Sequence, residues 1–130
     1  NQCPQLKIVR IDGSIYFGAI EHITSFFEKI HTGPEKKVLL VANGVNFIDL
    51  AGAEWLVSES KKWREKGGGL YISGLKIVAQ DVLIKGGFRE KIGEEAFFSK
   101  KKEAIKSIYQ DLDPEICKAC TSRIFTECKT

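Results

Sequence analysis

The sequence predicts one α/β domain in which a mixed sheet of about four to five strands is flanked by about four to five helices, in the order ββαβαβα(β)α. Short β-rich runs alternate along the chain with segments whose apolar residues recur at helical spacing. One run, Val38–Ala42, is continuously apolar, as expected of a strand covered on both faces. The 130 residues have room for one core of this kind.

The first part of the chain predicts a hairpin and a helix. Leu6–Ile11 and Ile15–Phe17 are rich in β-forming residues and flank the turn signal Asp12-Gly13-Ser14, which favours two antiparallel strands. Between Ala19 and His31 the apolar residues recur at helical spacing, and Gly33-Pro34 then ends the pattern. We expect an amphipathic helix with one buried face.

The middle of the chain contains the strand Val38–Ala42, which we expect at the centre of the sheet, and a second helix. A loop is expected over Asn43–Ile48, after which the Asp49 side chain can cap the helix. Gly67–Gly69 ends this helix. Its buried face is predicted from residues that share one side of the helix: Ala53, Leu56, Val57, Ser60 and Trp63.

The last part repeats the alternation. Leu70–Ser73 predicts a short strand, and a weaker helix follows from Ile77 to the glycines at 86 and 87. Ala96–Phe98 predicts a brief edge strand, and Ser99 is expected to cap a last helix before Pro114. The apolar stripe of that helix is Ala104, Ile105, Ile108, Tyr109 and Leu112. We therefore expect a domain over residues 6–112 and a cysteine-containing tail over residues 113–130.

Composition and charge exclude several classes of protein. The 20 Lys and Arg against 17 Asp and Glu give a net charge of +3, which is too small and too evenly spread to predict nucleic-acid binding. No run approaches the ~20 apolar residues of a membrane span. The chain has no methionine and begins at Asn1, so we expect that an upstream segment has been removed. Four cysteines are too few for a disulfide scaffold, which favours a reduced, intracellular domain.

No group of residues predicts catalysis, so we expect a protein that is not an enzyme and carries no cofactor. His22 and His31 differ by about half a turn in phase on the first helix, and we expect a surface residue and a helix C-terminal cap. Gly67–Gly69 lies between a helix and a strand, the reverse of the order that a phosphate-binding loop needs.

The cysteines leave alternatives open. Cys117, Cys120 and Cys128 have the spacing C-x2-C-x7-C, and Cys3 could supply a fourth ligand to tetrahedral zinc. The second chelating pair of a zinc knuckle is missing, however. A redox or disulfide role and reduced thiols in a docked tail are the other interpretations, and we expect the thiols, without a metal.

The segment that joins the central strand to the second helix is the most informative. The backbone N–H groups of Leu50, Ala51 and Gly52 are the unpaired donors of a helix start, where an anion would be bound favourably. Capping by Asp49 alone is the simpler interpretation of the same residues.

Two segments near opposite ends of the chain resemble one known family. Residues Arg10 to Ala19 resemble the strand-turn-strand opening of the STAS domain in bacterial SulP sulfate transporters. Leu112–Cys117, followed by Cys120, Arg123–Phe125 and Cys128, is similar to the end of many bacterial SulP chains. The resemblance implies a cytoplasmic C-terminal domain of a membrane-embedded anion transporter in the bacterial inner membrane.

STAS domains also include anti-sigma factor antagonists, in which the same helix start carries a phosphorylatable Ser or Thr. Asp49 and Gly52 match that motif, whereas Leu50 and Ala51 stand where hydroxyl groups would be. A phosphoryl group needs an oxygen to carry it, so a phosphorylation switch at Ala51 is excluded. The resemblance leaves Asp49, the helix start and the neighbouring Phe47 as a surface for another protein or for the membrane domain.

Trp55 supports such a surface. It lies ~160° around the helix from Ala53, away from the predicted apolar stripe, where a large exposed aromatic residue often marks an interface. Partial packing against the preceding loop is the alternative interpretation.

The resemblance therefore implies a non-catalytic regulatory domain of a SulP-type transporter of sulfate or a related anion. Its expected partners are the membrane domain of the same polypeptide, a second copy through a full-length homodimer, and a cytosolic regulatory protein. A nucleotide- or anion-sensing module and a free-standing anti-sigma antagonist are the alternative functions.

Overall fold

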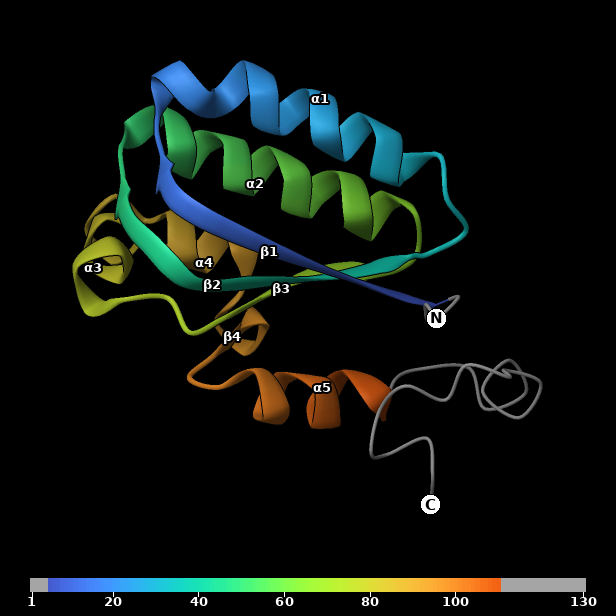
Figure 1. The fold of residues 1–130 in the computed structure, drawn as a ribbon. Helices are drawn as coiled ribbons and strands as arrows, with labels where there is room; N and C mark the ends of the chain where they lie inside the picture. Colours follow the sequence, from blue (N-terminus) through green and yellow to red (C-terminus); the bar gives the residue numbers. More distant parts are fainter. Residues whose placement is uncertain (1–4, 111–130) are drawn as a thin grey trace.

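Four strands form one sheet in the computed structural model, which describes residues 5–110 (Figure 1). Along the sheet the order is β1 (Leu6–Ile15), β2 (Lys37–Ile48), β3 (Gly69–Ser73) and β4 (Phe97–Phe98). Each described pair of neighbouring strands is parallel. Parallel neighbours need crossover connections, and helices between the strands supply them.

Helices cover both faces of this sheet (Figure 1). On one face lie α1 (Ile20–His31), α2 (Leu50–Glu65), α3 (Ile77–Lys85) and α4 (Phe88–Ile92), whereas α5 (Lys101–Tyr109) lies on the other. Two short 3-10 turns, η1 (Phe17–Ala19) and η2 (Glu94–Ala96), precede α1 and β4. The predicted α/β class is therefore confirmed, with strand and helix numbers inside the expected ranges.

The core is divided between the two faces. The larger cluster lies under α1 to α4 and includes Phe27, Leu40 and Leu56, all almost fully buried. The smaller cluster lies under α5 and consists of Leu6, Leu39, Ala104 and Ile108. Because adjacent residues Leu39 and Leu40 are buried in different clusters, the prediction that this strand is covered on both faces is confirmed.

The predicted hairpin over residues 6–17 is wrong. A single strand, β1, runs through the turn signal and pairs with β2, which itself continues to Ile48 through the residues predicted as a loop. Gly13 adopts a φ of 89° inside β1. The partner of Arg10 is Val41 whereas that of Asp12 is Gly44, so β2 carries an extra residue there. The turn residues thus form an irregularity within a longer strand, and the sheet of the described residues is parallel instead of mixed.

Two further expectations need correction in the last part of the chain. Ser99 does not cap the last helix, because α5 begins after Lys100 and has no side-chain cap hydrogen bond. The short helix α4 was not predicted, since its five residues are too few to establish a period. The edge strand is confirmed at Phe97–Phe98. The predicted tail over residues 113–130 lies outside the described residues.

Candidate functional site

Asp49 lies where β2 ends and α2 begins, and it connects three segments. Its Oδ1 accepts a hydrogen bond from the N–H of Gly52 at 2.8 Å, which confirms the predicted N-cap. Its Oδ2 accepts from the N–H of Phe17 at 3.0 Å, and its own N–H donates to the carbonyl of Ile15 at 3.2 Å. The cap of α2 therefore also holds the end of β1 and the start of η1.

The Asp49 carboxylate takes the place that an external anion would occupy at this helix start. The N–H of Phe17 and then that of Gly52 hold the pKa of Asp49 below its ordinary value, with a smaller contribution from Ala51. The same backbone donors that would bind a phosphate or sulfate thus already serve a negative group of the chain itself.

Gly52 allows the close approach of α2 to β1. The residue is buried, and a Cβ at this position would overlap the carbonyl oxygen of Ile15 and lie 2.9 Å from its carbonyl carbon. Gly52 is therefore a packing residue beneath the surface, while Ala51 is half-buried and Leu50 is exposed.

Exposed apolar side chains gather around this junction. We name this set the carboxyl-end patch, because its residues lie at or after the carboxyl ends of β1, β2 and β3: Tyr16, Phe17, Phe47, Leu50, Ile77 and Val78. Phe17 is 78% exposed and Ile77 80%. In Figure 1 the first residues of α1, α2 and α3 lie at the same end of the molecule. Phe17 reaches the patch through its bond to Asp49, and Lys76 Nζ donates to Asn46 Oδ1 at 2.5 Å, which joins the start of α3 to β2.

Four of the six patch residues were missed from the sequence: Tyr16, Phe17, Ile77 and Val78. The sequence predicts Tyr16 and Phe17 in the second strand of a hairpin, and Ile77 and Val78 in a weaker helix. The signal that could have found them is their position directly after a strand, since the loops that follow parallel strands meet at one edge of a sheet. Of the predicted residues, Phe47 and Leu50 do lie on the exposed surface beside Asp49.

Trp55 is not part of this surface, so the prediction that it is exposed is wrong. Its side chain is only 7% exposed and packs edge to face on Phe27 of α1, with ring centroids 5.1 Å apart. The reason is that α2 packs against α1 as well as against the sheet. Within the described residues, Trp55 Nε1 has no hydrogen-bond partner.

His31 connects α1 to α2 and does not merely cap its helix. Its Nε2 lies 2.7 Å from Oε1 of Glu59, a buried carboxylate that also accepts the indole N–H of Trp63 at 3.2 Å. The His31 and Trp63 rings lie 4.6 Å apart. His22 is exposed, as expected, and none of the hydrogen bonds described for this cluster involves it. The arrangement is a structural link between two helices.

Residues 5–110 contain no group of three or more His, Cys, Asp or Glu side chains that could hold a metal ion. The candidate ligands Cys3, Cys117, Cys120 and Cys128 lie outside the described residues. Among the described helices, none combines the length and apolar character needed to span a bilayer.

Comparison with known sequences shows which family and which proteins this chain resembles. Residues 1–104 match the STAS domain family. A curated relative from Bacillus subtilis (strain 168), named "Putative sulfate transporter YvdB", is 29% identical over 101 residues, which are 77% of this chain and 19% of the relative. The chain thus corresponds to about a fifth of the length of that relative.

Solved structures share the fold. A sulfate transporter family protein from Wolinella succinogenes is 26% identical, with a TM-score of 0.71 over 81% of this chain and 85% of that one. The SulP transporter STAS domain from Vibrio cholerae is 21% identical, with a TM-score of 0.69 over 85% and 86% of the two chains. A "putative anti-sigma factor antagonist" from Thermotoga maritima is 15% identical, with a TM-score of 0.71 over 80% and 87%. At these identities the last two show a common fold alone.

Proposed function

This chain belongs to the STAS domain family, and from that premise we propose that it is the regulatory domain of a SulP-type transporter of sulfate or a related anion. It performs no reaction of its own. It docks through the carboxyl-end patch on the membrane domain of the same polypeptide, at the cytoplasmic face of the membrane. The relative named as a sulfate transporter and the Wolinella protein support the transporter branch of the family.

The exposed apolar side chains of the carboxyl-end patch are the observation that carries this proposal. Large exposed apolar groups gathered in one place are uncommon on a protein that works alone, and they favour a docking surface. The polar groups among them are already bonded, Asp49 to Phe17 and Gly52, and Lys76 to Asn46. Contact with this surface would therefore be mainly apolar, beside one acidic and one basic side chain that are held by neutral partners.

The absence of hydroxyl groups at Leu50 and Ala51 supports a docking surface that phosphorylation at the helix start does not control. Regulation would then follow the conformational state of the membrane domain. A domain that contacts two transporter states differently can bias them only by the difference in contact free energy, typically about 1–3 kcal/mol, which corresponds to about 5- to 150-fold in their ratio.

Anion uptake by the full-length transporter that carries this chain tests the proposal. We expect the double substitution Phe17→Ser and Leu50→Ser to change the uptake rate at least about threefold at equal membrane abundance, because both side chains are exposed and lie beside Asp49. Ile84→Ser is the matched control, since Ile84 is also exposed but lies in the last turn of α3, about two turns beyond the patch residue Ile77. Equal uptake by the double variant and the wild-type protein would refute docking through this surface.

A second measurement, on the isolated chain, distinguishes an anion-sensing role from docking on the membrane domain. Sulfate, ATP or GTP at the start of α2 would have to displace the Asp49 carboxylate from the Gly52 N–H. We therefore expect no change in the amide NMR signals of Asp49 to Gly52 at millimolar concentrations of these anions. Saturable shifts confined to these amides would favour the sensing function instead.

A further inference from the structure

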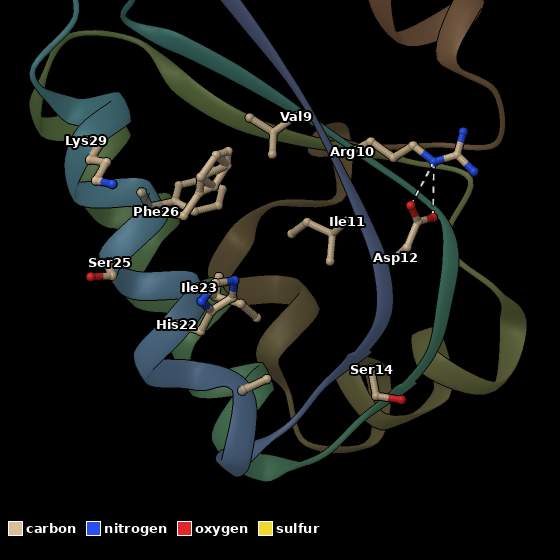
Figure 2. Close-up of a pocket in the computed structure, with 12 residues that line it drawn as sticks. Val9, Arg10, Ile11, Asp12, Ser14, His22, Ile23, Ser25, Phe26 and Lys29 are labelled. Carbon is tan, nitrogen blue, oxygen red and sulfur yellow. Dashed lines mark hydrogen bonds and ion pairs between the residues drawn. The ribbon is translucent and has the colours of Figure 1, made fainter.

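A groove outside the carboxyl-end patch runs between α1 and β1 (Figure 2). Its volume is about 590 Å³, and sites for small molecules commonly measure about 300–1,000 Å³. Val9 and Ile11 of β1 point toward α1, and Ile23 and Phe26 of α1 line the opposite wall. Phe26 is 44% exposed, so part of this apolar lining is open to solvent.

The sequence of β1 separates apolar from charged side chains. Successive side chains of a strand point to opposite faces, so Val9 and Ile11 face the groove while Arg10 and Asp12 point away from α1. Asp12 is the one carboxylate among the described residues that line the groove, and its Oδ1 lies 3.1 Å from Arg10 Nε. The strand therefore contributes an apolar wall and no unpaired negative charge.

Helix α1 adds two side chains that carry N–H groups, one toward each end of the groove (Figure 2). His22, Phe26 and Lys29 share one side of the helix, because steps of four and three residues separate them. With the described residues, the Lys29 ammonium forms no ion pair and the His22 ring no hydrogen bond. Glu21 and Glu28 are exposed on α1 but do not line the groove. The ends of the groove are therefore suited to an anionic group that these residues do not supply.

We propose that this groove binds a medium-chain alkyl carboxylate, with the carboxylate at Lys29 and the alkyl chain along the apolar walls toward His22. The seven-residue step between these two side chains rises about 10 Å along the helix, close to the extended length of a chain of about eight carbons. An inorganic anion would use the lysine alone, and a neutral apolar molecule the walls alone. The presence of both favours a ligand with an apolar chain and one negative charge. This site is separate from the carboxyl-end patch and does not depend on docking there.

Amide NMR titration of the 130-residue chain with sodium octanoate tests the site, at concentrations below those at which octanoate forms micelles. Saturable shifts are expected at the amides of residues 9–14 and 22–29, with a Kd of about 0.1–1 mM. From hexanoate to octanoate, each added CH2 group should tighten binding about two- to fourfold, since complete burial of one CH2 corresponds to about fourfold. Chains longer than about eight carbons would extend past His22 and should gain less per carbon.

Substitutions separate the contribution of the charge from that of the apolar walls. Lys29→Gln should weaken octanoate binding about three- to tenfold but change the binding of octan-1-ol, which lacks the charge, less than about twofold. Phe26→Ser should weaken both ligands at least about threefold. Lys106→Gln is the matched control for the lysine, because Lys106 is also exposed in the last turn of its helix, α5, on the other face of the sheet. It should leave octanoate binding unchanged.

Four results would overturn the proposal. The first is the absence of shifts in the groove at about 10 mM octanoate. The second is equal weakening of octanoate and octan-1-ol by Lys29→Gln, or equal weakening of octanoate by Lys29→Gln and Lys106→Gln. Shifts that appear only with vesicles of neutral phospholipid would assign the groove to a membrane surface instead. Shifts that appear only with inorganic sulfate would show an anion site that makes no use of the apolar walls.

Discussion

Replacement of Gly52 by alanine is expected to destabilise the protein, although the same change stabilises most exposed helices. In a helix interior alanine is favoured over glycine by about 1 kcal/mol. At Gly52 the added methyl group would overlap the carbonyl oxygen of Ile15 and lie 2.9 Å from its carbonyl carbon and 3.0 Å from Cγ2. Two of the three nearest atoms are backbone, so the overlap cannot be relieved by rotating a side chain.

The size of the destabilisation follows from the segments that the added methyl group pushes apart. Overpacking a well-packed site costs about 1–3 kcal/mol, and we place Gly52→Ala at the upper end of this range because α2 and the end of β1 must separate. That separation also weakens the 3.2 Å hydrogen bond that the Ile15 carbonyl accepts from the N–H of Asp49. After subtraction of the helix preference, the net loss in the free energy of unfolding is about 2 kcal/mol.

Urea unfolding followed by circular dichroism measures this loss. With an m-value of about 2 kcal/mol/M, the midpoint should fall by about 1 M for Gly52→Ala. Ser58→Ala, at an exposed position in the same helix, should leave the midpoint within about 0.3 M of the wild-type value. A midpoint for Gly52→Ala at or above that of the wild-type protein would refute the close packing of α2 on β1.

Other predictions concern Asp49 and the two tryptophans. The folded pKa of Asp49 is lowered from 3.8, so its carboxylate contributes stability above about pH 4 that is lost as the pH falls through the lowered value. The difference in urea midpoint between the wild-type chain and Asp49→Ala should therefore shrink on acidification, and a constant difference would contradict this. Trp63→Phe should cost about 1–3 kcal/mol more than Trp55→Phe, because within the described residues only the Trp63 indole N–H has an acceptor, and its loss removes a donor from the buried Glu59 carboxylate, which keeps only its contacts with His31 and Lys62. Equal thermal unfolding shifts for the two variants would argue against this difference.

Local patterns were sufficient to predict the elements that are buried on both faces or capped by their own residues. Val38–Ala42 was identified because a strand between two helical layers needs apolar residues at every position. Asp49 was identified because the N-cap bond to Gly52 spans only three residues. The junction between β2 and α2 was thus located from the sequence, and Phe47 and Leu50 do lie on its surface.

Features that depend on distant residues could not be predicted in this way. The turn signal at residues 12–14 is overridden by a partner strand more than 30 residues later, with Asp12 opposite Gly44. Trp55 is buried because α1 covers the side of α2 that carries it, through Phe27, which the helical period of α2 alone does not reveal. Phe17 is held at the site by the hydrogen bond of its N–H to Asp49, 32 residues away.

The parallel arrangement has a consequence for how the chain reaches its native state. Leu6 pairs with Lys37, and Lys37 pairs with Gly69, so no strand can join its neighbour before an intervening helix has been synthesised and closed into a loop. Contacts of such long sequence separation slow folding, because the entropy of loop closure is lost before the pairing is gained. During synthesis on the ribosome, the backbone groups of β1 therefore stay hydrogen-bonded to water until β2 has been made. The bonds of Asp49 to the N–H groups of Phe17 and Gly52 can both be present only after that point.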